Sequence, residues 1–372
     1  YLWPLGIIIP LLPVMSYVWV EMTGWGGMWW WGFFFLYAVI PAMDYLFGDD
    51  TINPPEAAVK TLENDSYYRW LTYLFIPAQY ATLLWGTWYI ATHDMLWWEM
   101  IGFSLSIGIV GGLAINTAHE LGHKRPALER WLSRITLAQT FYGHFYVEHN
   151  RGHHKNVATP EDPASSRMGE SFYAFLPRTV IGSLKSAWHL EAERLNRCGK
   201  SVWHYSNENL QSWAMSVVLY GGLLAVFGWK VLPFLLIQIV YGFSLLEVVN
   251  YLEHYGLVRQ KEASGRYERC QPEHSWNSNH IVTNLLLYQL QRHSDHHANP
   301  TRRYQALRAF DKVPELPSGY AAMILIAYFP PWWRAVMDKR VVAHYNGDLT
   351  RANLHPSKRE DLLAKYTPSA LA

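Results

Sequence analysis

Residues 100–124 read MIGFSLSIGIVGGLAINTAHELGHK, and this stretch decides the fold. Residues 100–118 contain no Asp, Glu, Lys or Arg, and a helix needs roughly 20 apolar residues to cross the hydrocarbon core of a membrane. The run ends at His119 and His123, which are four residues apart and therefore share one face of a helix. The stretch predicts a membrane-spanning helix whose end presents two imidazoles to one metal ion.

Five other apolar stretches have the length of a membrane span. Together with residues 100–119 they predict spans at about residues 1–20, 22–43, 70–93, 210–229 and 231–252. Short connections join them in pairs, as antiparallel neighbours require. We expect an all-α integral membrane protein with six transmembrane helices.

The long polar segments predict the orientation in the membrane. Of 31 Lys and Arg residues, only Lys230 falls in a short hairpin loop, and positive charge marks the cytoplasmic side. We therefore expect a cytoplasmic, histidine-rich cap built from residues 119–209 and 253–372, with both termini cytoplasmic and one domain over residues 1–372. Residues 316–333 are uncharged but interrupted by prolines, so we expect them to lie at the membrane interface.

The composition excludes several classes of protein. The chain of 372 residues has a formal net charge of +1, which gives no sign of nucleic-acid binding. Cys198 and Cys270 are its two cysteines and form no CxxC motif, so neither a disulfide framework nor a sulfur-bound metal site is expected. Its 17 histidines are the unusual feature.

The histidines gather in short motifs that predict metal ligation. HELGHK begins at residue 119, EHNRGHH at 148, NYLEHYG at 250 and LQRHSDHH at 290. In EHNRGHH, His149 and His153 are four residues apart, and the adjacent His154 can turn toward a second ion or a different coordination site. The candidate ligands are His119, His123, His149, His153, His154, His254, His293, His296 and His297.

Nine imidazoles exceed the coordination of one ion and suit iron, copper, nickel or zinc. We therefore expect two metal ions. Four acids adjoin these histidines and are candidates to orient them through hydrogen bonds: Glu120, Glu148, Glu253 and Asp295. The isolated His144, His274 and His280 are candidates for the surroundings of the site.

Three other readings account for fewer of these residues. HELGH fits the HExxH motif of zinc proteases, but that site needs one further ligand. A carboxylate-bridged di-iron bundle requires two ExxH motifs, and Glu120 to His123 provides the single one near the clusters. A metal transporter would place its ligands midway along the spans.

At these motifs the sequence resembles the membrane histidine-box superfamily of desaturases and hydroxylases, and within it the bacterial alkane 1-monooxygenases. The segments ATPEDPASSRMGES and HSWNSNH resemble the connecting segments of that family. The resemblance covers nearly the whole chain.

The resemblance implies terminal hydroxylation of medium-chain n-alkanes by O2 in the bacterial inner membrane. It also implies two iron ions held by the nine histidines, and electrons from rubredoxin, which an NADH-dependent reductase reduces. Xylene-type hydroxylation and fatty-acid hydroxylation or desaturation remain open, because the superfamily shares these motifs. An alkane dissolves in membrane lipid, so a tunnel between the spans would deliver it. We expect some bulky residues of the first two spans to limit chain length, among Trp29, Trp30, Trp31, Phe33, Phe34 and Leu36.

Overall fold

The computed structural model describes residues 2–366. Over these residues the chain forms helices joined by loops, with isolated β-bridges but no β-strand. The long helices are α1 (Ile8–Thr23), α5 (Ser66–Thr92), α6 (Trp97–Gly122), α7 (Ala127–Leu137), α10 (Phe172–Arg197), α11 (Glu208–Phe227), α12 (Leu232–His254) and α16 (Pro330–His344). The shorter ones are α2 (Trp31–Phe34), α3 (Ile40–Phe47), α4 (Glu56–Asn64), α8 (Phe145–Glu148), α9 (His154–Asn156), α13 (Ile281–Leu286), α14 (His293–Ala298), α15 (Tyr320–Ala327) and α17 (Arg359–Tyr366).

Within the described chain, five helical segments are long and apolar enough to cross a membrane. They are Trp3–Thr23, Gly26–Phe47, Trp97–Gly122, Glu208–Phe227 and Trp229–His254, and they coincide with five of the six predicted spans. The protein is therefore an all-helical, multi-pass membrane protein. Helix α5 covers the other predicted span and has 27 residues, but its Tyr- and Trp-rich sequence is less apolar. Its crossing of the membrane stays a prediction.

Helix α6 lies at the centre of the fold. Over an 18-residue apolar stretch of its span 78% of the residues are buried, compared with 22–44% in the corresponding stretches of the other four. It packs closely on α12 through glycines: a Cβ on Gly242 of α12 would lie 3.3 Å from the carbonyl oxygen of Gly108, and a Cβ on Gly112 would lie 3.0 Å from that of Gly242. Small residues allow two membrane helices to approach this closely. The contact brings the histidine-bearing ends of both helices together.

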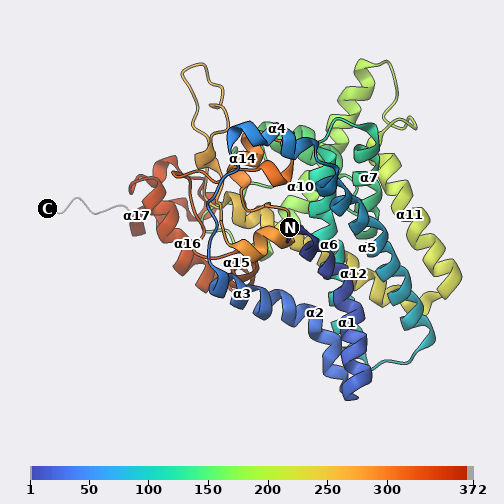
Figure 1. Ribbon diagram of the computed structural model, residues 1–372. Coiled ribbons are helices and arrows are strands. Elements are labelled where there is room, and N and C mark those ends of the chain that lie inside the picture. The colour runs from blue at the N-terminus through green and yellow to red at the C-terminus, as the bar shows by residue number, and fades with distance from the viewer. Residues whose placement is uncertain (1, 367–372) are drawn as a thin grey trace.

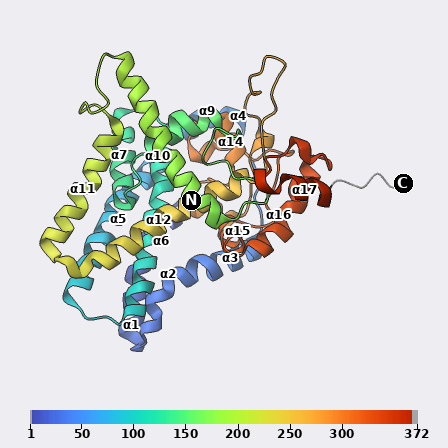
Figure 2. The same cartoon turned by 180° about the vertical axis from the view of Figure 1, so that it is seen from behind.

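The C-terminal helices form the opposite side of the molecule from α11. Figures 1 and 2 show α14 to α17, in orange and red, grouped on the side away from the yellow-green α11. Helix α15 belongs to this group, and its Tyr320, Met323 and Ala327 are fully buried. The apolar residues of α15 face the protein core. This burial does not decide the depth of residues 316–333 in the membrane, so their position at the membrane interface stays a prediction.

A buried carboxylate ties the second span to the C-terminal half. Asp44, near the end of α3, accepts hydrogen bonds from the backbone N–H of Thr283 at 2.9 Å and from its hydroxyl. Asp44 is 1% exposed and Thr283 is 2% exposed. Loss of one partner would leave the other unsatisfied in the interior, which is more costly than the bond itself is stabilising.

We predict that Asp44→Ala lowers the free energy of unfolding by about 1–3 kcal/mol, since it leaves two buried donors of Thr283 without an acceptor. The measurement is the thermal midpoint of the detergent-solubilised protein. Glu56→Ala is the matched control, because Glu56 pairs with Arg308 at the surface with 79% of its side chain exposed. Equal midpoints for the two variants would contradict the role of Asp44.

Candidate metal centre

The nine predicted ligands converge in two groups. His119, His123, His149, His154 and His296 form the first group, and His153, His254, His293 and His297 form the second. Within each group the candidate ligand nitrogens all lie within 4.8 Å of one another. His119 and His123 share the first group, as their spacing predicts. We call these the five-histidine and four-histidine groups.

A π-helical turn determines to which group each histidine of the EHNRGHH motif belongs. Residues His149–His153 form a π-helix, in which residues five apart, not four, are brought together by the i to i+5 hydrogen-bond pattern. His149 and His154 accordingly approach with their Nε2 atoms 3.1 Å apart, whereas His153 joins the other group. The spacing of four residues between His149 and His153 therefore does not bring them into one group.

Polar contacts at Nδ1 orient three rings of the four-histidine group. The Nδ1 of His153 lies 3.0 Å from Oδ2 of Asp162, and the Nδ1 of His254 lies 3.2 Å from the carbonyl oxygen of His274. The Nδ1 of His293 lies 3.2 Å from Oε1 of Glu253. Each contact leaves Nε2 facing the centre of the group. Such outer contacts orient metal-bound imidazoles and fix their tautomer.

Asp162 is the residue that sequence reasoning missed. It is fully buried, and Ser165 also donates to its Oδ2 at 2.6 Å. Burial favours the neutral form of Asp162, but His153 and Ser165 outweigh this effect and lower its pKa. In the sequence it stands nine residues after His153, inside the run PEDP, and no spacing rule joins the two. The resemblance of that run to the connecting segments of a metalloenzyme family was the available signal.

Among the four acids chosen from the sequence, Glu253 contacts a candidate ligand. Glu120 lies 3.1 Å from Lys124 and accepts from the N–H of Tyr304. Asp295 accepts from Arg302 at 2.7 Å. Glu148 is buried against Gly152, and burial raises its pKa to about 7. Glu120 and Asp295 therefore bind the loop after α14 to the site.

The chemistry of the two groups fits metal ions. The Nε2 atoms of His119 and His296 are 2.9 Å apart, as are those of His293 and His297. Burial, then repulsion between neighbouring rings, lowers the pKa of His123, His149 and His296. Neutral rings present lone pairs, and a cation between them supplies the missing partner.

An orphaned nitrogen supports the same conclusion in each group. The Nε2 atoms of His123 and His153 are buried and have no hydrogen-bond partner among the described residues. Burying an unpaired polar atom is unfavourable. An all-imidazole donor set of this kind suits iron, copper, nickel or zinc and not magnesium or calcium.

The remaining histidines lie outside both groups. His274 contributes its carbonyl oxygen to His254, as described above, and His280 contacts Ser278. His93 stacks on Tyr89, and His189 pairs with Glu193 at the surface. His144 is buried near Tyr142, with ring centroids 4.4 Å apart.

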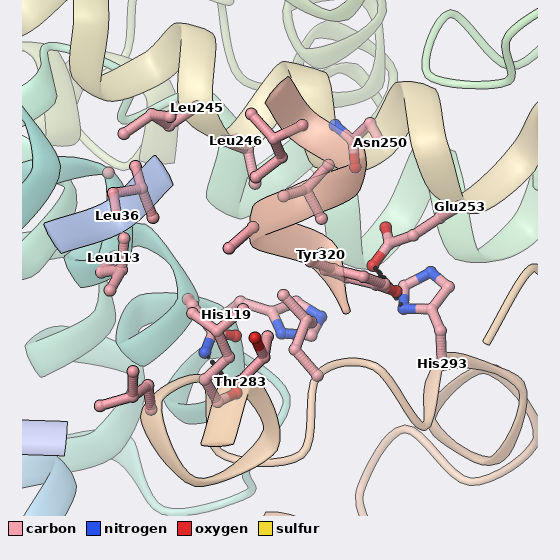
Figure 3. Close-up of a pocket in the computed structure, with 18 of the residues that line it drawn as sticks. Leu36, Leu113, His119, Leu245, Leu246, Asn250, Glu253, Thr283, His293 and Tyr320 are labelled. Carbon is pink, nitrogen blue, oxygen red and sulfur yellow. Dashed lines mark hydrogen bonds and ion pairs between the residues drawn. The ribbon is translucent and has the colours of Figure 1, made fainter. Parts of the chain in front are cut away.

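An apolar cavity, here called the first cavity, adjoins both groups. Its lining includes His119 and His149 of the five-histidine group and His293 of the four-histidine group. Figure 3 shows Leu36, Leu113, Leu245 and Leu246 toward one end and Glu253 and His293 toward the other. Its polar residues are engaged elsewhere: Asn116 donates to the carbonyl oxygen of Leu287 and Tyr320 donates to Glu253. The cavity is therefore suited to hold an apolar molecule beside these histidines.

Of the six bulky residues singled out in the first two spans, Leu36 lines this cavity. Trp29 packs on Phe103 in a separate aromatic cluster, and the side chain of Trp30 donates to the carbonyl oxygen of Trp98. Phe34 is 54% exposed. Of the six residues, Leu36 is therefore the one placed to contact an alkane bound in the first cavity.

Comparison with known proteins places the chain among membrane metalloenzymes. A family model described as fatty acid desaturase matches residues 96–335. The chain is 51% identical to an alkane 1-monooxygenase of Pseudomonas putida, over 99% of this chain and 91% of the relative. It is 54% identical to an alkane 1-monooxygenase of Acinetobacter baylyi, over 89% and 81% respectively. It is 29% identical to the hydroxylase component of a xylene/toluene monooxygenase of Pseudomonas putida, over 88% and 87%.

We predict that Asp162→Asn weakens metal binding roughly 10- to 100-fold, the usual cost of losing an acid that orients a metal-bound histidine. The measurement is retained metal after equilibration with a chelator, read by elemental analysis. Glu161→Gln is the control, since Glu161 contacts Tyr267 at the surface and no histidine of either group. The same metal retention in both variants would remove Asp162 from the site.

Proposed function

Because the chain belongs to the fatty acid desaturase family and, within it, to the alkane 1-monooxygenases, we propose that it is a monooxygenase that converts medium-chain n-alkanes to 1-alkanols with O2. Sequence identity favours an alkane over an aryl methyl substrate. The chain is 51% identical to the alkane 1-monooxygenase of Pseudomonas putida and 29% identical to the xylene/toluene relative. The single observation that carries the proposal is an apolar cavity lined by three of the nine converging histidines, His119, His149 and His293.

The five-histidine and four-histidine groups would each hold one iron ion. Iron is among the metals that imidazole sites accept, and the resemblance to di-iron hydroxylases selects it. Bound iron would supply the activation of O2 that attack on an unactivated C–H bond requires, because an alkane offers no acid, dipole or leaving group to the protein. Asp162, Glu253 and the carbonyl oxygen of His274 hold the ligand rings of the four-histidine group in place.

The protein's own contribution to the reaction is alignment. The leucines of the first cavity hold the alkane by burying its methylene groups, each worth about 0.8 kcal/mol. A chain held against Leu36, Leu245 and Leu246 would have its terminus close to His119 or His293, which line the same cavity. Asn116 and Tyr320 keep their polar atoms bonded within the protein, which disfavours water in the cavity.

The electron route and the membrane orientation follow from the same family assignment. We infer that rubredoxin, reduced by an NADH-dependent reductase, supplies electrons at the cytoplasmic face of the bacterial inner membrane. In this arrangement α5 would be the sixth span, residues 1–372 would form one domain, and both termini would lie in the cytoplasm. The concentration of Lys and Arg in the long segments supports this side.

A zinc protease is the less favoured alternative. Its HExxH motif requires the glutamate to activate a metal-bound water, but Glu120 is paired with Lys124 and accepts from the N–H of Tyr304. His119 and His123 are also joined by three further histidines, more than a protease site uses.

We predict two iron ions per purified chain, and 1-octanol from octane when rubredoxin, its reductase and NADH are supplied. Iron is measured by elemental analysis and the product by gas chromatography. His123→Ala and His254→Ala, one from each group, are expected to lose activity and to lower the iron content, because each removes a ligand. One zinc without oxygen consumption would favour the protease, and two irons without octanol would move the substrate to lipids or aryl methyl groups.

We predict that Leu36→Ala raises the ratio of long-chain to octane turnover by roughly tenfold or more, the scale of discrimination that a few methylene groups produce in an apolar pocket. Product distributions from mixed alkanes provide the measurement. Phe34→Ala is the control, because Phe34 is 54% exposed and lies outside the cavity lining. An unchanged chain-length profile in the Leu36 variant would separate this cavity from substrate binding.

A further inference from the structure

Three tyrosines from distant segments of the chain meet in one hydrogen-bonded group, here called the tyrosine cluster. The hydroxyl oxygen of Tyr37 lies 2.8 Å from that of Tyr241 and 3.2 Å from that of Tyr328. Tyr37 belongs to the second span, Tyr241 belongs to α12, and Tyr328 directly follows the last residue of α15. The cluster therefore joins three elements that also form walls of the first cavity.

Along α12, the tyrosine cluster stands one turn beyond the first cavity. Among the α12 residues that line the cavity are Glu253, Val249 and Leu245, which are spaced by four and share one face of the helix. Tyr241 is the next residue of this series. Glu253 contacts His293 at 3.2 Å, so it stands at the metal end of the cavity. Leu245 is at the opposite end (Figure 3), and Tyr241 lies behind it.

Helix α15 runs past the cavity in the opposite direction and reaches the same cluster. Its first residue, Tyr320, lines the cavity and donates to Glu253 at the metal end. Ile324 also lines the cavity, four residues further along. The backbone N–H of Tyr328 donates to the carbonyl oxygen of Ile324 at 3.3 Å, so the helical geometry continues to Tyr328. Tyr328 thus stands behind the last cavity residue of α15.

Helix α6 bounds the cluster on a further side. Gly112 of α6 lines the cavity, and Gly108 precedes it by about one turn. A Cβ on Gly108 would lie 3.0 Å from Cδ1 of Tyr241, so the tyrosine ring packs directly on the backbone of α6. On α6, α12 and α15 alike, the turn beyond the cavity leads to the tyrosine cluster.

The hydroxyl groups make the cluster resistant to an entering hydrocarbon. An alkane that extended past Leu245 would have to separate Tyr241 and Tyr328 from Tyr37, and an alkane offers no hydrogen-bond partner in exchange. Leaving a hydroxyl unpaired in such surroundings costs more than the burial of one further methylene group gains. The cluster therefore opposes a longer chain through its hydrogen bonds as well as through the bulk of its rings.

The distance to the metal end gives this barrier a consequence for substrate length. From Leu245 to Glu253 the axis of α12 rises by about 12 Å, a length that suits extended octane and is well short of hexadecane. We propose that the tyrosine cluster is the closed end of the alkane site and sets the longest alkane that the first cavity accepts. This inference rests on the proposed hydroxylation of n-alkanes. It adds a hydrogen-bonded stop to the wall contact made by Leu36.

The test measures alkane binding to the purified full-length protein in detergent, without turnover. Octane and hexadecane probes, each with a diazirine at one end, are photolysed, and mass spectrometry quantifies the labelling of residues that line the first cavity. The ratio of hexadecane to octane labelling is expected to be low in the unaltered protein. Since no reaction is needed, failure of this expectation is distinguishable from failure of the hydroxylation assay.

Tyr241→Phe and Tyr328→Phe each keep the ring and remove one hydroxyl, so we predict that each raises the ratio roughly two- to tenfold, the scale of one hydrogen bond. Tyr45→Phe is the matched control, because Tyr45 is 87% exposed near the end of the second span. Octane labelling reports a folded cavity, and the two substitutions lie on different elements, so one remains decisive if the other variant does not fold. A high ratio in the unaltered protein, or an unchanged ratio in the folded phenylalanine variants, would overturn the proposal and leave the cluster a structural link between helices.

Discussion

The close contact of α6 and α12 is the constraint on which the rest of the structure depends. Glycines at 108, 112 and 242 let the two backbones meet, and the ends of these helices carry His119 and His254, one from each histidine group. A wider separation would pull the groups apart and open the first cavity, which residues of both helices line. Packing in the membrane thus positions ligands that the loops complete.

Burial of nine imidazoles is unfavourable without compensation, and the protein provides it from two directions. Inside each group the facing nitrogens are suited to a cation. Outside the four-histidine group, Asp162, Glu253 and the carbonyl oxygen of His274 hold the opposite nitrogens. Arg302 and Lys124 serve a different purpose, because they neutralise Asp295 and Glu120 and so attach the loop after α14.

The sequence predicted what depends on local pattern and failed where three-dimensional context decides. Uncharged runs located five helical segments that are long and apolar enough to cross a membrane, and the histidine motifs located the residues that converge. Spacing could not assign His149 and His154 to one group, because it assumed 3.6 residues per turn where the chain forms a π-helix. It could not find Asp162. Asp162 lies nine residues after His153, and only the folding of the buried segment between them brings the two side chains into contact. The sequence could not show that α15 is covered by protein, because apolar residues look alike whether lipid or protein covers them.

His153 and His154 are neighbours in the chain but belong to different groups. A single peptide unit therefore connects the two metal sites, and that unit is part of an uncommon helical turn. If each group holds an ion, the first ion to bind would hold this backbone in place for the second. Binding at the five-histidine and four-histidine groups would then be coupled through one peptide unit.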